Sequence, residues 1–219
     1  MMALATGIRA ESGKLARNFA IFALVLAGLP GLPAAAWATP VPGQPAPAFA
    51  GTDTQGRAVS ISDYRGSIVV LEWTNNECPF VQRQYQSGNM QSLQKQAAAA
   101  GVVWLTIVSS APGEQGFVNG PQADKLTADR DAAPRAVILD PSGEIGHTYG
   151  AKTTPHMYVI DPSGTLVYMG AIDDQPRITS TSPAEAHNYV RAALAALADG
   201  KPVATPVTQA YGCSVKYKG

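Results

Sequence analysis

Cys78 stands where a cysteine can act as a nucleophile. It follows the apolar stretch 68–73 after a short polar link, and the next residue, Pro79, favours the first position of a helix. A thiol at a helix N-terminus faces backbone N–H groups that have no partner within the helix, and their partial positive charge favours the thiolate. Because the thiolate is the reactive form, this position predicts thiol chemistry. The alternative is a buried cysteine that packs as a small hydrophobe.

The chain has one other cysteine, Cys213, which lies 135 positions after Cys78. In an oxidising compartment an even number of cysteines favours pairing, so we expect these two to be joined at some stage. The three histidines, His147, His156 and His187, form no closely spaced set of metal ligands. A metal site built from the two cysteines and His156 is an alternative, but the sequence predicts neither a metal nor a cofactor.

Residues 1–38 have the pattern of a secretory signal peptide. Basic residues precede an apolar run over 19–29, and Ala36-Trp37-Ala38 matches a cleavage site of small residues. The run is shorter than the roughly 20 residues that span a bilayer. We therefore predict an exported protein, periplasmic or secreted, with no membrane span after cleavage. An uncleaved anchor is the alternative.

The predicted mature chain, 39–219, has the length of one domain with a full core. The full sequence carries 16 basic and 16 acidic residues, a formal net charge of zero, and no basic tract. This balance argues against a nucleic-acid partner.

Apolar periodicity and turn residues predict an α/β arrangement that would hold Cys78 between a strand and a helix. The expected strands are 48–50, 58–60, 68–73, 102–108, 136–140, 156–161 and 165–170, and the expected helices are 79–100, 122–130, 142–149 and 183–198. Gly88 and Asn89 mark a break within the first helix, and Ser182 is the expected N-cap of the last. We expect a mixed central sheet between helices, with the loop 109–121 near the site.

An ordered set of motifs along 39–219 carries a family resemblance. The set comprises the strand that ends in Trp73, then Cys78-Pro79, then Lys152-Thr153-Thr154-Pro155-His156, then Tyr168-Met169-Gly170-Ala171-Ile172-Asp173-Asp174, and finally Gly212-Cys213-Ser214-Val215-Lys216-Tyr217. It resembles the thioredoxin superfamily, and more closely the exported peroxiredoxin-like redoxins of the alkyl hydroperoxide reductase/thiol-specific antioxidant type. The final motif is similar to the tail of one peroxiredoxin-like subgroup.

The resemblance implies a thioredoxin-like α/β fold with an N-terminal β-hairpin extension. It also implies that Pro155 is cis and that the loop through Thr154 and Pro155 faces Cys78. A cis proline makes a tight turn that exposes the backbone of the preceding residue. Thr154 and Pro155 are therefore candidate site residues beside Cys78.

The chain departs from the family patterns on both sides of Cys78. Thioredoxin-like oxidoreductases have a second cysteine three positions later, where this chain has Val81. Peroxiredoxins have Thr or Ser three positions earlier, where this chain has Asn75, with Thr74 one position further away. Asn75 or Thr74 could still bind a peroxide, but the departure puts fast peroxide reduction in doubt.

Cys213 is the natural substitute for the missing second thiol. Peroxide attack on a thiolate gives a sulfenic acid, which a second thiol converts to a disulfide. A permanent disulfide is one alternative, and closing so long a loop would stabilise the fold by about 5 kcal/mol in the chain-entropy model. An unpaired Cys213 is the other.

Two charged residues are auxiliary candidates. A buried Glu72 could have a raised pKa and pass protons to Cys78, and strand alternation places it on the face opposite Leu71 and Trp73. Arg83, in the first turns of the expected helix, could stabilise a thiolate. The alternatives are a satisfied structural carboxylate and a solvated helix surface.

Together these residues predict an exported, thiol-dependent redox protein. Cys78 would attack a peroxide or a disulfide, Cys213 would resolve the product, and an external thiol would restore both. The competing hypothesis is a non-catalytic binding or structural protein with a permanent Cys78–Cys213 disulfide. A metal chaperone that uses both thiols and His156 is a third.

Overall fold

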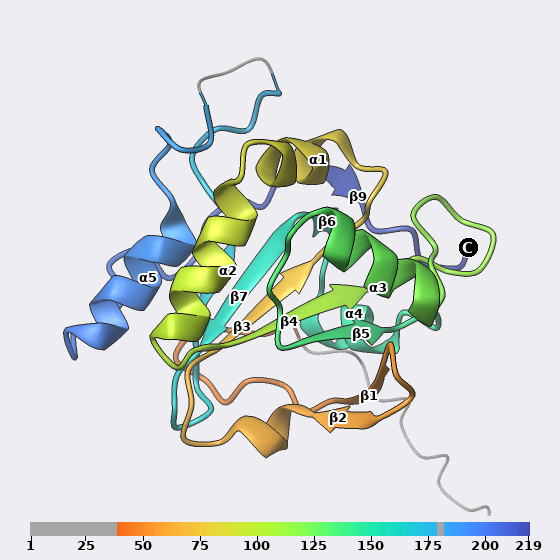
Figure 1. Cartoon of the computed structure of the whole chain (residues 1–219). Coiled ribbons are helices and arrows are strands. Elements are labelled where there is room, and N and C mark those ends of the chain that lie inside the picture. The colour runs from red at the N-terminus through yellow and green to blue at the C-terminus, as the bar shows by residue number, and fades with distance from the viewer. Residues whose placement is uncertain (1–38, 179–181) are drawn as a thin grey trace, which may run out of the picture. The chain divides into compact units, whose positions relative to one another are not determined.

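Seven strands form one mixed sheet in the order β2-β1-β5-β4-β3-β7-β8 (Figure 1). A computed structural model describes residues 39–178 and 182–219, so the predicted signal peptide lies outside the described residues. The strands are β1 (Ala50–Asp53), β2 (Ala58–Ser60), β3 (Val69–Trp73), β4 (Val103–Val108), β5 (Ala136–Leu139), β7 (His156–Ile160) and β8 (Leu166–Gly170). Two further short strands, β6 (Thr153–Thr154) and β9 (Cys213–Ser214), pair with each other.

The helices are α1 (Pro79–Gln86), α2 (Asn89–Ala99), α3 (Gly120–Asp129), α4 (Glu144–Tyr149) and α5 (Tyr189–Ala198), with a short 3-10 helix at Ile61–Tyr64. The expected break after the first helical segment is present, because Gly88 has a φ of 76°, in the left-handed region that favours glycine. No helix of the described part of the chain is long and apolar enough to cross a membrane.

Strand β3 lies inside the sheet and ends at the turn that leads to Cys78. It pairs in parallel with β4 and antiparallel with β7, and all five of its residues are buried. A strand covered on both faces needs a nearly continuous apolar run, which explains the pattern in the sequence.

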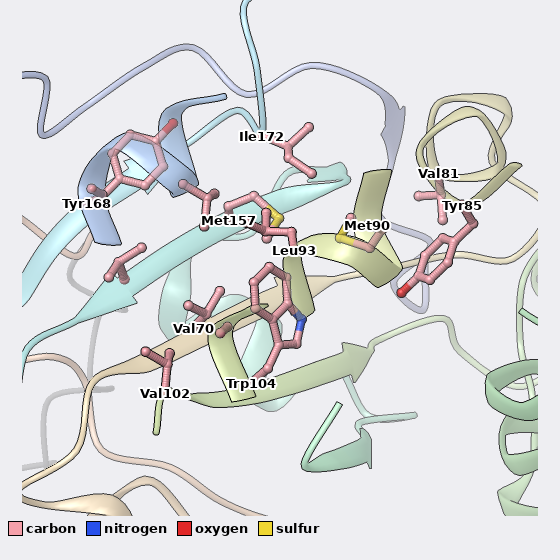
Figure 2. Packing of buried hydrophobic residues seen from close by; sticks show 14 of the residues in the cluster. Val70, Val81, Tyr85, Met90, Leu93, Val102, Trp104, Met157, Tyr168 and Ile172 are labelled. Carbon is pink, nitrogen blue, oxygen red and sulfur yellow. The ribbon is translucent and has the colours of Figure 1, made fainter. Parts of the chain in front are cut away.

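Alternating side chains divide the core between the two faces of the sheet. On one face, residues such as Val70, Trp104 and Met157 pack against α1, α2 and α5 (Figure 2). On the other face, Leu71 and Trp73 belong to a second cluster that includes residues of α4 and of the N-terminal hairpin. The sheet is therefore a rigid support for the turn between β3 and α1.

Two predicted elements are displaced along the chain. The first expected strand, 48–50, is found at Ala50–Asp53. The expected helix 183–198 starts only at Tyr189, and its N-cap is Asn188 rather than Ser182. The preceding residues instead pair with the chain after β8: the backbone N–H of Asp174 donates to the carbonyl of His187 (3.2 Å), and that of Tyr189 donates to Ile172 (3.0 Å). These bonds use the backbone groups that a helix would need.

Candidate functional site

Cys78 is the N-cap of α1, and Pro79 follows it as the first helical residue. Its backbone N–H donates to the carbonyl oxygen of Asn75 at 3.1 Å, and its own carbonyl accepts from Gln82 at 2.9 Å. The Asn75 side chain tightens the same turn, because its oxygen accepts from the backbone N–H of Glu77 at 2.8 Å. The Cys78 side chain is fully buried. The thiol is thus held rigidly where the sheet meets the helix.

The peptide bond between Thr154 and Pro155 is cis, and Thr154 lies next to Cys78. The Cys78 thiol donates to the carbonyl oxygen of Thr154, with the sulfur 3.1 Å from the oxygen. The hydroxyl of Thr154 is buried and has no hydrogen-bond partner among the described residues. A hydroxyl in this place is available to an anion or a substrate at the sulfur.

The C-terminal tail brings the second thiol to the same place. Strand β9 pairs antiparallel with β6, with Thr154 opposite Cys213 and Thr153 opposite Ser214. Figure 1 shows β9 beside the start of α1. Cys213 is partly buried and packs against the core cluster that contains Cys78, and both cysteines are free thiols.

The surroundings shift the pKa values of the two thiols in opposite directions. Burial raises the pKa of Cys78, but a Cys78 thiolate can accept hydrogen bonds from the side chains of Cys213 and Thr154 and from the Val81 backbone. These donors outweigh burial, so the pKa is lowered overall. Burial, together with its contact with Cys78, raises the pKa of Cys213 to about 11. The site therefore favours a thiolate at Cys78 beside a protonated Cys213.

Removing either side-chain donor should make Cys78 less acidic. We expect Cys213→Ala and Thr154→Val each to raise the pKa of Cys78, because a thiolate then loses a hydrogen bond. The ultraviolet absorbance of the thiolate, followed against pH, measures this without requiring access to the buried sulfur. Thr153→Val is the matched control, since the Thr153 hydroxyl donates to the carbonyl of Pro155 (3.2 Å). A midpoint that stays in place in both variants contradicts the expectation.

The tail is anchored before the cysteine by contacts with β8 and the residues after it. Two backbone bonds join Met169 to this segment, one to the carbonyl of Pro206 (3.0 Å) and one from the N–H of Thr208 (3.1 Å). The Thr208 hydroxyl lies 2.6 Å from the hydroxyl of Tyr168 and accepts from the backbone N–H of Ala171 at 2.9 Å.

Further anchors follow the cysteine. The N–H of Val215 donates to the carbonyl of Lys152 (3.0 Å), and the carbonyl of Lys216 accepts from Ala111 (2.8 Å). The ring of Tyr217 stacks on His147 with centroids 4.0 Å apart, and its hydroxyl donates to the carbonyl of Ala151 at 2.7 Å. The loop 109–121 thus contacts the tail, as well as Asn75, whose side-chain amide donates to the carbonyl of Gln115.

Gly212 allows the tail to approach the cis-proline turn. Its φ of 134° lies in the region that favours glycine, and a Cβ at this position would lie 2.0 Å from the carbonyl oxygen of Thr154. A side chain of any size would therefore push the tail away from Thr154 and move Cys213 with it.

Glu72 lies under the helices, on the face that sequence alternation predicts. It is fully buried, and its carboxylate accepts hydrogen bonds from the side chains of Tyr85 (2.9 Å), Gln94 (3.0 Å), Trp104 (2.8 Å) and Thr106 (3.2 Å). Burial raises its pKa, and these four donors oppose the shift. The carboxylate joins α1 and α2 to the sheet.

The remaining auxiliary residues occupy different surroundings. The guanidinium of Arg83 donates to the backbone carbonyls of Gln175 (3.1 Å) and Arg177 (3.0 Å). Both polar ends of the Asn75 side chain bind backbone groups, as described above. The Thr74 hydroxyl is buried without a partner among the described residues and lines a cavity of about 30 Å³ together with Asn76 and Arg130.

His156 is buried next to the cis proline and stays neutral. Burial, and secondarily the charge of Lys152, lowers its pKa to about 4. Its Nδ1 atom lies 3.3 Å from the backbone nitrogen of Lys152, which donates to it, and 3.2 Å from the hydroxyl of Tyr158. Within 39–178 and 182–219, no group of three or more His, Cys, Asp or Glu residues could hold a metal ion.

Acid should destabilise the fold through His156. Its pKa is lower in the folded chain than the ordinary value of about 6.5, so the unfolded chain binds the proton first. The free energy of unfolding should fall as the pH drops from about 6.5 to about 4, by up to about 3 kcal/mol. Denaturant unfolding of the protein and of His156→Gln measures the difference, because other groups titrate equally in both. A difference that is constant across this range contradicts the prediction.

The sequence does not single out Tyr211 as part of this site, and Gly212 and Asp173 stand in the family motifs without a role of their own. Asp173 and Asp174 resemble a turn, yet Asp173 is buried and accepts a hydrogen bond from Tyr211. The signals in the sequence are the tail motif, which includes Gly212, and the position of Tyr211 directly before it.

Comparison with known families agrees with this architecture. The family model described as AhpC/TSA matches residues 42–169, which is more than half of the chain. The chain belongs to the AhpC/TSA family. Cys78 and the Thr154-Pro155 turn lie within the matched residues, whereas Cys213 lies beyond them. No sequence among curated proteins matches.

Two solved structures are similar over most of their length. An uncharacterized conserved protein from Geobacillus kaustophilus is 28% identical, with 81% of this chain and 93% of that chain covered and a TM-score of 0.72. A hypothetical protein from Sinorhizobium meliloti 1021 is 23% identical, with 83% and 97% covered and a TM-score of 0.71. The predicted thioredoxin-like fold, a mixed sheet flanked by helices, is confirmed, and membership of this redoxin family supports a redox function.

Proposed function

We propose that this AhpC/TSA-family protein is an exported thiol-dependent redox protein in which Cys78 is the nucleophile and Cys213 the resolving thiol. One observation carries the proposal: β9 places Cys213 opposite Thr154, whose carbonyl oxygen accepts the hydrogen bond of the Cys78 thiol. Two thiols that are far apart in sequence therefore lie at one site. The pattern of residues 1–38 supports export.

The acidities of the two thiols support these roles. A lowered pKa at Cys78 increases its thiolate share, while a pKa of about 11 keeps Cys213 protonated near neutral pH. The attacking group must be a thiolate. Cys78 is thus suited to the first attack, and Cys213 must lose its proton during the second step.

With a peroxide as substrate, the Cys78 thiolate attacks one oxygen and the O–O bond breaks. The leaving alkoxide or hydroxide takes a proton, and Cys78 becomes a sulfenic acid. The sulfur of Cys213 then attacks the sulfur of Cys78, so that water leaves and a disulfide forms. An external dithiol supplies two electrons and two protons to restore both thiols. With a disulfide as substrate, a mixed disulfide replaces the sulfenic acid, and the same Cys78–Cys213 bond results.

Burial favours a small substrate for the first step. The Cys78 side chain has no exposed surface and the tail pairs with the strand that carries Thr154, so a folded partner protein cannot reach the sulfur in this arrangement. The unpartnered Thr154 hydroxyl offers a hydrogen bond to a peroxide oxygen. We therefore place peroxide reduction ahead of protein disulfide exchange.

Steady-state turnover with an external dithiol tests the proposal. We expect the protein to consume hydrogen peroxide or an organic hydroperoxide faster than it reduces a model protein disulfide. Cys213→Ser should lower turnover, because each sulfenic acid must then wait for the external thiol. Faster reduction of the protein disulfide would favour exchange over peroxide reduction. A protein that turns over neither substrate would favour the non-catalytic alternative with a permanent disulfide.

A further inference from the structure

Tyr211 contacts α1, the helix whose N-cap is Cys78. Its ring packs edge-on against Phe80, with ring centroids 5.7 Å apart and an interplanar angle of 63°. Phe80 is the second residue of α1, and Tyr211 precedes Cys213 by two positions. The tail thus contacts α1 through two residues that each lie two positions from a cysteine.

A buried carboxylate strengthens this link. The Tyr211 hydroxyl donates to Oδ1 of Asp173, whose side chain is only 1% exposed. The side-chain amide of Gln84, also on α1, donates to Oδ2 of the same carboxylate at 2.7 Å, and the backbone N–H of Gln175 donates to Oδ1 at 2.9 Å. Asp173 therefore joins the tail to α1 through a second path.

Gln84, which donates to Asp173, is itself held in place. The Asn89 side chain donates to the Gln84 side-chain oxygen at 2.6 Å, so the amide of Gln84 is oriented with its nitrogen toward Asp173. Burial, followed by the hydrogen bond and charge of Asp173, raises the pKa of Tyr211. Its hydroxyl accordingly stays protonated and keeps donating at every pH at which the site works.

Two independent contacts thus fix Cys213 relative to Cys78. The β6–β9 pairing holds it from the side of the cis-proline turn, and Tyr211 holds it from the side of α1. Holding two reacting groups in the right geometry removes much of the entropic barrier to their reaction. In the first step, attack of Cys78 on substrate, Cys213 is only a hydrogen-bond donor to the thiolate and not a reactant.

We propose that Tyr211, together with Asp173, is a positioning residue for the resolution step, in which Cys213 attacks the oxidised Cys78. This inference rests on the proposed function. In the step, the sulfur–oxygen bond of the Cys78 sulfenic acid breaks, the sulfur–sulfur bond forms, and water leaves with the proton of Cys213. Tyr211 contacts neither the substrate nor the reacting sulfur atoms and acts through the placement of Cys213.

Single-turnover oxidation of Tyr211→Phe separates the two steps. The variant keeps the ring against Phe80 and loses only the hydroxyl. The reduced protein is mixed with hydrogen peroxide, samples are trapped with dimedone over time, and intact mass reports the sulfenic acid adduct and the disulfide separately. We expect sulfenic acid to form at the rate of the unmodified protein and the disulfide to form about 10-fold more slowly, because the lost hydrogen bond to a charged acceptor is worth that factor or more.

Two further variants complete the test. Asp173→Asn, which keeps the size of the side chain and removes its charge, should slow the same step, and combining it with Tyr211→Phe should add little. Tyr189→Phe is the matched control, since Tyr189 lies on α5 and its ring packs near Tyr168, 6.4 Å between centroids. It should leave both rates unchanged.

Each outcome decides one question. Unchanged disulfide formation in Tyr211→Phe and Asp173→Asn overturns the positioning role, and so does an equal slowing of both steps, which would indicate a general structural role. If the unmodified protein forms neither adduct nor disulfide, peroxide reduction itself fails, and the positioning role in sulfenic acid resolution falls with it.

Discussion

Cys78→Ser should lose thiol-dependent turnover by at least about 1,000-fold, because a serine hydroxyl is a far weaker nucleophile than a thiolate. The substitution replaces one atom in a fully buried site, so the fold should remain. Initial rates of peroxide consumption with an external dithiol measure the loss, and circular dichroism checks the fold.

Cys213→Ser is the comparison variant for this result. It keeps Cys78 and a hydrogen-bond donor beside it, so it should still react once with peroxide and stop or slow at the sulfenic acid. If both variants lost the first reaction with peroxide equally, the attack would require both cysteines and not Cys78 alone. Full turnover in Cys78→Ser would remove the catalytic role altogether.

Gly212→Ala should detach the tail from the site. The added Cβ would lie 2.0 Å from the Thr154 carbonyl oxygen, and the φ of 134° strains any residue with a side chain. We expect disulfide formation after a single addition of peroxide to slow by at least about 10-fold, since Cys213 no longer lies opposite Thr154. The free energy of unfolding should fall by about 1–3 kcal/mol.

Gly200→Ala is the matched control for the backbone strain. Gly200 also has a positive φ, 66°, but no atom lies within 4 Å of the position of its Cβ. Stopped-flow oxidation and denaturant unfolding of both variants separate strain from displacement. If Gly212→Ala forms the disulfide as fast as Gly200→Ala does, the docked tail is not what brings Cys213 to Cys78.

The sequence predicts the parts of the site that depend on neighbouring residues. The apolar run of β3, the turn to Cys78 and the helix start at Pro79 are local patterns, and the break at Gly88 follows from a glycine that takes a positive φ. The cis bond before Pro155 was expected from the family resemblance, and it is present.

Contacts between segments that are distant in the chain could not be predicted from the sequence. The β6–β9 pairing involves two residues on each strand, which is too short for any periodicity to show. Asp173 is adjacent to another aspartate in a segment that reads as a turn, and only the folded chain brings Tyr211 to it. The late start of α5 has the same cause, because pairing with residues 172–174 uses the backbone groups first.

The two halves of the site differ in their relation to the family. The residues that hold Cys78 lie within the segment that matches the AhpC/TSA model, whereas the tail that carries Cys213 lies after it. The shared fold thus places Cys78, the proposed nucleophile, and Gly212, Tyr211 and the anchors on either side of them place the second thiol. Changes in the tail should therefore alter resolution more than attack.

The most direct test of the central claim, that Cys78 and Cys213 form one redox pair, is the intact mass of the reduced protein after one equivalent of hydrogen peroxide. The account predicts a rapid loss of two hydrogens in the unmodified protein. In Cys213→Ser it predicts instead the gain of one oxygen, located on Cys78 by peptide mapping. A loss of two hydrogens that persists in Cys213→Ser would contradict the pairing of the two thiols. A mass that does not change would contradict peroxide reduction and leave disulfide exchange or a non-catalytic role.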